Sequence, residues 1–263
     1  MAIQSLDDYI KASKSMIVQK KTASITTDKN IISSPFGAAG IPGAGVLAGT
    51  NTANGVVPTD ATAGCPVIPD FGVGNTGYIT RLNGYCSVAG TILLADLLFK
   101  AGAYVFNANV TLASQPSYAE RVPAGGWGAT AILLESVTAH TGNQSIRIIY
   151  EDGDDVERDT GTVATGAAPR VGRCYQVPLV GAGNGVKKIK QVISTVSSAG
   201  TFNVLVVRWL AQMRIPFASY GESRDLYGTG MPIIYQDSAL VVYNRPDSTA
   251  MGLPEWEIEI ANG

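Results

Sequence analysis

The residue types that could do chemistry are few in this chain, and they are scattered. The only histidine, His140, stands in the short segment 138–142, and no G-x-S-x-G sequence occurs. A serine nucleophile needs a base beside it, so a Ser–His hydrolase is disfavoured. A metal site built on histidines is excluded for the same reason. We therefore expect no enzyme, no catalytic residue and no bound metal.

One glycine pattern resembles a phosphate-binding loop. Residues 72–77, Gly-Val-Gly-Asn-Thr-Gly, match G-x-G-x-x-G. The dinucleotide-binding version needs a strand before it and a helix after it. Here Pro69-Asp70-Phe71 precedes the glycines, and the strand-like residues 78–80 follow them. We interpret the segment as a glycine-rich connection and expect no cofactor.

Two charged clusters could bind ions. The acidic run 151–159 offers the carboxylates that calcium prefers, but it lacks EF-hand spacing and includes Arg158. We predict a solvated hairpin turn at Asp152-Gly153, with a calcium site, or a hydrolase using these acids, as lesser alternatives. The basic cluster Lys187, Lys188 and Lys190 predicts a solvent-facing strand, with a nucleic-acid patch as its alternative.

Aromatic residues could stack on sugars. Trp127, in the segment Gly-Gly-Trp-Gly at 125–128, is the tryptophan that a loop would present, whereas the apolar surroundings of Trp209 predict a core position. This keeps open an alternative function, a tail or fibre module that binds host glycan.

The composition points to assembly. Charged residues make up 15% of the chain, against about 25% in ordinary globular proteins. The 19 basic and 21 acidic residues leave a net charge of −2, which disfavours a nucleic-acid partner. No apolar run is long enough to span a membrane, and the N-terminus has no signal-peptide pattern. A surface so poor in charge predicts burial by other subunits.

The three cysteines, Cys65, Cys86 and Cys174, include no C-x-x-C pair. We predict reduced and mostly buried thiols in a protein made in the cytoplasm.

The N-terminal region predicts a helix followed by an extended arm. Ser5 and Asp8 form a capping box, and an apolar stripe predicts a helix over residues 5–20, either packed on its own domain or docked on a partner. Residues 30–80 are rich in Gly and Pro and almost uncharged, which suits an arm laid along a neighbouring subunit; the alternative is a long ordered loop on the same domain. The candidate docking residues on this helix and arm are Leu6, Tyr9, Ile10, Met16, Ile17, Phe36, Ile41, Leu47 and Phe71.

The rest of the chain reads as strands. Runs rich in Val, Ile, Thr, Tyr and Trp occupy 132–137, 145–150, 186–196, 201–213, 232–235, 239–243 and 256–260. The run that begins at Phe202 is apolar on both faces, as a central strand should be. These patterns predict an all-β fold, a β-sandwich of jelly-roll type over residues 76–263, preceded by the helix and arm of residues 1–75.

Several segments resemble virion proteins of tailed bacteriophages. The resemblance rests on strand and turn patterns within residues 76–263, including Asp96-Leu-Leu-Phe99 after an apolar strand, 148–150 before the acidic turn, 199–210 and 230–235. It implies a structural component of the phage particle, similar to the trimeric jelly-roll cement proteins on the capsid lattice. The expected partners are further copies of this chain and the major capsid protein, at the capsid surface. The patterns do not separate a head protein from a tail protein.

Overall fold

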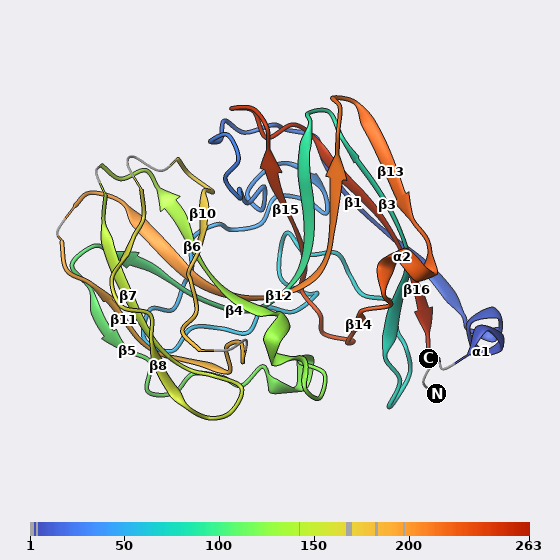
Figure 1. Ribbon diagram of the computed structural model, residues 1–263, viewed down its shortest axis with the longest axis horizontal. Coiled ribbons are helices and arrows are strands. Elements are labelled where there is room, and N and C mark those ends of the chain that lie inside the picture. The colour runs from blue at the N-terminus through green and yellow to red at the C-terminus, as the bar shows by residue number, and fades with distance from the viewer. Residues whose placement is uncertain (1–2, 4, 142, 167–169, 182–183, 197) are drawn as a thin grey trace.

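The computed structural model describes residues 3, 5–141, 143–166, 170–181, 184–196 and 198–263. The described strands form three antiparallel sheets (Figure 1). The predicted all-β sandwich is confirmed. The described helices are short: α1 (Leu6–Lys11), α2 (Leu226–Thr229) and the single turns η1 (Ala119–Arg121) and η2 (Gly126–Ala129). No helix among the described residues is long and apolar enough to cross a membrane.

The central sheet contains the two longest strands. Its order is β10 (Cys174–Gln176), β6 (Thr130–Thr138), β12 (Thr201–Ile215), β4 (Gly90–Val105) and β15 (Leu240–Pro246). β12 lies in the middle, and its residues from Phe202 to Val207 are all buried. The prediction that this run is a central strand covered on both faces is confirmed.

Two further sheets cover one face of the central sheet. The terminal sheet has the order β13 (Tyr220–Arg224), β3 (Gly77–Cys86), β16 (Pro254–Asn262), β1 (Lys14–Lys21) and β2 (Gly40–Ile41), and β14 (Ile233–Ile234) pairs with β3. The hairpin sheet has the order β5 (Asn109–Thr111), β11 (Lys188–Ser194), β7 (Ser145–Glu151) and β8 (Glu157–Asp159), and β9 (Val163–Ala164) pairs with β7. They occupy the right and left sides of Figure 1.

Strand alternation gives each covering sheet its own core. Along β4, Ile92 and Leu94 pack toward the terminal sheet, and Leu98 packs toward the hairpin sheet. Side chains two residues apart on a strand share a face, so both cores lie on the same face of the central sheet. Asp96 stands between them.

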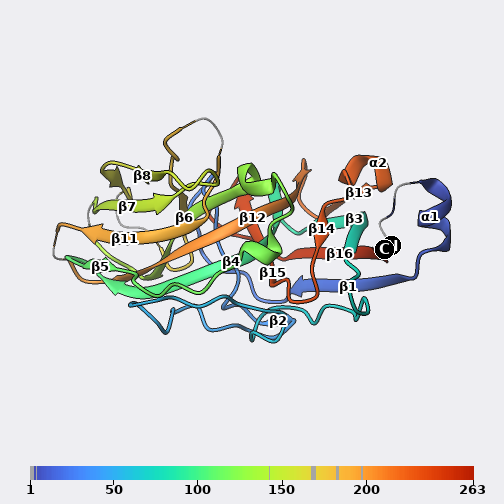
Figure 2. The ribbon, with the colours of Figure 1, turned by 90° about the horizontal axis from the view of Figure 1, so that it is seen from below.

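Residues 30–75 cover the opposite face. Leu93, Ala95 and Leu97 of β4 belong to a third core that also contains Phe36 and Cys65. The two edges of the central sheet approach each other here, because Ser33 forms bridges to both Arg173, beside β10, and Asn244 of β15. In Figure 2 the blue-to-cyan segment runs along the underside of β4 and β15.

The predicted helix over residues 5–20 is wrong beyond Lys11. Residues 14–21 form strand β1, whose register with β16 runs from Lys14 opposite Ala261 to Lys20 opposite Glu255. Met16 and Ile17 therefore point to opposite faces of a strand, Met16 to solvent and Ile17 into the core. Sheet pairing across the whole chain overrides the local helical pattern.

The segment predicted as an arm packs on its own chain. Phe36, Ile68 and Phe71 are each buried in one of the two cores that this segment reaches. The observed packing matches the alternative reading, a long ordered loop on the same domain. Whether residues 1–75 also reach a neighbouring subunit, and whether the chain divides at residue 75 in an assembly, stay predictions.

Candidate functional site

Helix α1 stands away from the body of the molecule (Figures 1 and 2). Ser5 caps it, since its hydroxyl accepts from the Asp8 backbone N–H at 3.2 Å, and Asp7 and Asp8 lie at the positive end of the helix dipole. None of its residues is buried. The helix is thus ordered locally while its apolar side chains remain in solvent.

Tyr9 attaches α1 to the terminal sheet. Its hydroxyl donates to Glu259 Oε1 at 3.1 Å, and the Lys14 ammonium lies 4.4 Å from the centre of its ring. Desolvation, with a further contribution from the Glu259 carboxylate, raises the pKa of Tyr9. With Tyr9 facing the sheet, Leu6 and Ile10 remain 58% and 63% exposed. They stand four residues apart and so share one side of the helix.

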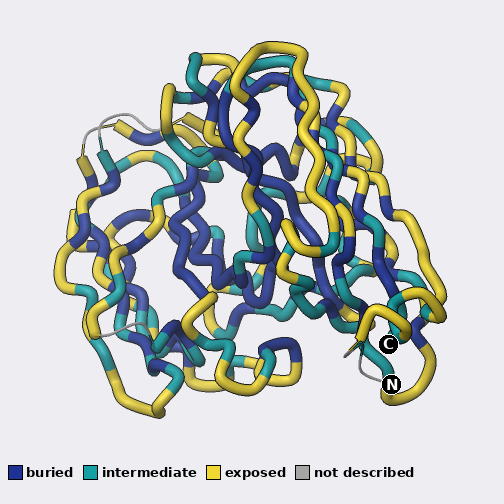
Figure 3. The backbone as a smooth tube through the Cα atoms, turned by 45° about the vertical axis from the view of Figure 1, so that its right-hand side comes forward, coloured by how far each residue is buried: buried dark blue, intermediate teal, exposed yellow. Residues whose placement is uncertain are grey.

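Strand β1 continues this apolar surface. Met16 and Val18 are exposed, and Met16 lies opposite Glu259, the residue that holds Tyr9. We call Leu6, Ile10, Met16 and Val18 the α1–β1 surface. Figure 3 shows the backbone beside the N-terminus as largely exposed.

The nine predicted docking residues differ in how far their side chains are exposed. Ile17, Phe36 and Phe71 are buried in cores of this chain, and Leu47 packs against the third core. These four side chains stabilise the chain itself. The residues with exposed side chains are Leu6, Ile10, Met16 and Ile41, whereas Tyr9 is half-buried.

Contacts within the chain limit the access of a ligand to the Trp127 ring. It lies in η2, packs against the core under the hairpin sheet, and meets Tyr118 edge-on at a centroid distance of 6.2 Å. A Cβ added at Gly153 or Gly185 would clash with Trp127, so the chain closes tightly around this residue. Its packing gives it a structural role, whereas glycan binding stays a prediction.

The acidic run forms the predicted hairpin between β7 and β8, with Glu151 opposite Glu157. Four of its six carboxylates are in ion pairs: Arg158 with Asp152 at 2.8 Å, Lys190 with Glu157 at 2.6 Å, Lys187 with Asp155 and Arg147 with Asp159. Two lysines of the basic cluster thus serve as partners for two carboxylates of the acidic run. Among the described residues, no group of three or more His, Cys, Asp or Glu could hold a metal ion.

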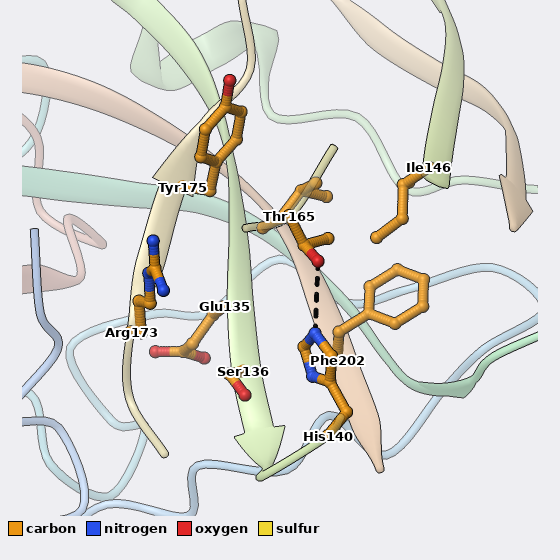
Figure 4. A pocket seen from close by; sticks show the side chains of 9 residues that line it. Glu135, Ser136, His140, Ile146, Thr165, Arg173, Tyr175 and Phe202 are labelled. Atoms are coloured by element: carbon orange, nitrogen blue, oxygen red, sulfur yellow. Dashed lines mark hydrogen bonds between the residues drawn. The ribbon is translucent and has the colours of Figure 1, made fainter. Parts of the chain in front are cut away.

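His140 lines a small pocket beneath the end of β6 (Figure 4). Its Nε2 lies 3.2 Å from Thr165 Oγ1, and its ring packs on Phe106 at 4.5 Å between centroids. Burial, assisted by the positive charge of Arg173, lowers its pKa. Figure 4 shows the ring facing Thr165, with Glu135 and Ser136 nearby on β6. Among the described residues that line the pocket, neither a serine nor a cysteine is hydrogen-bonded to the imidazole, which bonds Thr165 instead.

Sequence reasoning missed a buried ionic cluster at Asp96. The two guanidinium groups of Arg121 and Arg208 flank the Asp96 carboxylate, which also accepts from Ser238 Oγ at 2.9 Å and from the Ala239 N–H at 3.0 Å. All three charged residues are at most 5% exposed. A signal was present, because an Asp within a long apolar run needs buried partners. Arg121 and Arg208 are far from Asp96 in sequence, so no local pattern identified them as its partners.

The three cysteines are free and buried, as predicted. Burial raises the pKa of the Cys65 thiol to about 12. A thiol held protonated in this way is a poor nucleophile, so these residues serve packing.

No family model matches the chain, and no curated protein matches it either. Among solved structures, the chain shows a likeness to the Gt strain of infectious bursal disease virus, with 11% identity over 94% of this chain and 81% of that chain, at a TM-score of 0.18. The Gx strain gives 10% identity over 95% and 81%, at a TM-score of 0.17. A mutant VP2 protein of the same virus, in derived T=1 particles, gives 11% identity over 99% and 79%, at a TM-score of 0.14. TM-scores this low carry no argument about function.

Proposed function

We propose that this chain is a non-enzymatic structural protein of a phage virion, a cement or decoration protein that binds and stabilises the capsid lattice. Its partners are the major capsid protein and further copies of itself, most simply in a trimer. It acts at the capsid surface after synthesis in the host cytoplasm.

One observation carries the proposal: α1 is capped and anchored, yet presents Leu6 and Ile10 to solvent. Fully burying one such side chain contributes about 1.5–3 kcal/mol. A short helix gains little from propensity alone, and here Tyr9 attaches it to the terminal sheet. An anchored helix with an unpartnered apolar side suits docking into a groove of a partner.

The surface charge supports the same proposal. The hairpin charges pair with one another, and the overall charge is close to zero. Such a surface offers little long-range steering, so contact depends on apolar area and on repetition. A trimer on a symmetric lattice would engage several sites at once, which raises the effective concentration of each docking helix.

The test uses point substitutions, because β1 lies between β16 and β2 in the terminal sheet and deletion of residues 1–75 would remove a paired strand. We compare the wild-type chain with the double variant Leu6→Asp, Ile10→Asp. The assay is co-sedimentation with particles assembled from the phage's major capsid protein. The double variant should bind at least about tenfold more weakly, a change of about 1.4 kcal/mol.

The matched control is the double variant Val105→Asp, Val196→Asp, which places the same two charges on exposed apolar residues, one at the far end of β4 and one between β11 and β12. The control should bind like wild type, and all three chains should unfold at the same denaturant concentration. Equal binding by the double variant, or no binding by the wild-type chain, would contradict the proposal.

A further inference from the structure

Three buried polar residues meet on neighbouring strands of the central sheet. Lys100 lies on β4, Asn203 on β12 and Glu135 on β6, with exposed fractions of 7%, 0% and 2%. Asn203 stands directly opposite Glu135 in the register. Lys100 stands opposite Leu205, two residues from Asn203 and on the same face of the sheet. An amine, a carboxamide and a carboxyl group are therefore neighbours in the third core.

The contacts of Asn203 orient its carboxamide. Its Nδ2 donates to Glu135 Oε2 at 2.7 Å and to the Leu47 carbonyl at 2.7 Å. Its Oδ1 accepts from the Gly49 backbone N–H at 2.9 Å. A backbone N–H aimed at Oδ1 stabilises negative charge that develops on that oxygen when a nucleophile adds to Cγ.

Burial favours the neutral form of the Lys100 amine, against two contacts that suit its charged form. Its Nζ donates to the Val46 carbonyl at 2.8 Å and lies 5.1 Å from the centre of the Phe36 ring. Within the described residues, no carboxylate lies at ion-pair distance from it. Burial lowers the pKa of Lys100, against the opposing effect of the Glu135 charge, and burial raises the pKa of Glu135. Both shifts favour the uncharged forms, an amine that can attack and a carboxyl group that can donate.

We propose that Lys100 and Asn203 form a covalent amide cross-link between β4 and β12, with Glu135 as the acid–base group. The bond would tie together the two long strands that run beneath both covering sheets. The inference is independent of the proposed virion function, because it rests on residues buried inside this chain.

The reaction balances without any further reactant. The Lys100 amine turns from the Val46 carbonyl and attacks Cγ of Asn203, forming the Nζ–Cγ bond and placing charge on Oδ1 beside the Gly49 N–H. Glu135 gives its proton to Nδ2 as the Cγ–Nδ2 bond breaks, and it takes a proton from Nζ in return. Ammonia leaves, a secondary amide remains, and nothing is oxidised or reduced. Burial of all three side chains limits competition from water.

The test is the mass of the intact, denatured wild-type chain. We expect a mass lower than that of the sequence, with or without Met1, by one molecule of ammonia. After trypsin digestion, residues 82–121 should appear joined to residues 191–208, because trypsin cannot cleave at a cross-linked Lys100. A wild-type mass equal to that of the sequence overturns the proposal by itself.

Variants assign the roles and use the same readout. Lys100→Met should keep the full mass, and so should Glu135→Gln, which keeps the shape of the side chain but cannot relay the proton. Asn203→Asp should lose one water instead of one ammonia and give the same product. The matched control is Lys21→Met, which removes another buried lysine, one that donates to the Ala38 carbonyl; it should retain the ammonia loss.

One competing source of ammonia loss is succinimide formation at an Asn-Gly pair such as Asn54-Gly55 or Asn83-Gly84. Fragmentation separates the two, since a succinimide leaves the two tryptic peptides unjoined. Ammonia loss without the joined peptides, or loss that persists in Lys100→Met, contradicts the proposal. Because the wild-type measurement needs no variant, a variant that fails to fold does not leave the question open.

Discussion

Two clusters of charged residues in this molecule differ in their surroundings: one lies around Asp96 and the other in the hairpin of residues 151–159. At Asp96 one carboxylate lies between Arg121 and Arg208, and none of the three is more than 5% exposed. In the hairpin of residues 151–159, pairs such as Arg147–Asp159 and Lys190–Glu157 have side chains roughly half in solvent. Only Asp152, whose carboxylate accepts from the N–H groups of its own turn, is buried there.

The comparison shows that a buried ion pair and an exposed ion pair contribute differently to the stability of the protein. Water solvates an exposed carboxylate whether or not its partner is present, so each exposed pair contributes little. Inside the protein, a charge without a partner keeps its whole desolvation cost. The buried cluster therefore constrains how the central sheet, η1 and β15 meet, while the hairpin pairs mainly keep that surface soluble and close to neutral.

The largest expected effect is at Asp96. Asp96→Ala leaves two buried guanidinium groups without their carboxylate and should lower the free energy of unfolding by about 3–5 kcal/mol. Chemical denaturation followed by circular dichroism measures it. Asp159→Ala, which breaks an exposed pair, is the matched control. Similar losses of unfolding free energy in the two variants would contradict the difference between buried and exposed ion pairs.

A smaller effect is expected at His140, which is buried and, within the part of the chain that the structure describes, forms no ion pair with a carboxylate. Burial and Arg173 lower its pKa in the folded state, so below about pH 6.5 the unfolded chain binds a proton that the folded chain does not. Stability should therefore be complete above about pH 6.5 and decline as the pH falls toward the lowered value. The free energy of unfolding at pH 7.5 and at pH 5.5 measures the decline.

The comparison variant is His140→Gln, which cannot titrate in this range. Glu135 lines the same pocket and burial raises its pKa, so the comparison with the variant isolates the share of the pH dependence that belongs to His140. The difference in stability between the two pH values should be smaller in the variant than in wild type. An equal difference would show that His140 does not contribute.

The smallest effect is expected at Asp159. Hydrogen bonds from Arg147 and from the Gly161 N–H lower its pKa to about 2. A carboxyl group with a lowered pKa stabilises the fold above its ordinary pKa of about 3.9, and this contribution is lost as the pH falls toward 2. Because the pair is exposed, Asp159→Asn should cost about 0.5 kcal/mol or less at pH 7, and less still in 1 M salt. A loss of stability that 1 M salt does not reduce would contradict the assignment of this loss to an exposed ion pair.

Local patterns predicted much of the fold. Each run rich in β-branched and aromatic residues contains a strand of the structure, and the Asp152-Gly153 turn joins β7 to β8. The capping box at Ser5 did begin a helix. These features depend on neighbours within a few residues, so the sequence shows them directly.

The candidate site was only partly predictable. The apolar stripe from Leu6 to Ile17 reads as one helix, but residues 14–20 pair with β16 along their whole length, and the chain becomes a strand there. The same change sends Ile17 inward and Met16 outward. Pairing with a strand more than 230 residues away leaves no local signal.

Residues 30–75 show the opposite case. Their Gly, Pro and apolar residues correctly excluded a helix, and their lack of charge correctly indicated burial against protein. The sequence did not say which protein, because an apolar residue such as Phe36 packs equally well on its own chain or on another. Residues 30–75 pack on their own chain because they cover the face of the curled central sheet that carries Leu93, Ala95 and Leu97. That apolar face would otherwise be exposed to water.

The sequence by itself determined the all-β class, the positions of the longer strands after residue 130, the hairpin and the shortage of surface charge, because these follow from residue periods and composition. The tertiary structure alone decided which charges are neighbours: Asp96 with Arg121 and Arg208, Lys100 with Asn203 and Glu135, Lys187 with Asp155. The physical reason is that strand pairing brings together residues distant in sequence, and burial then changes what those residues can do.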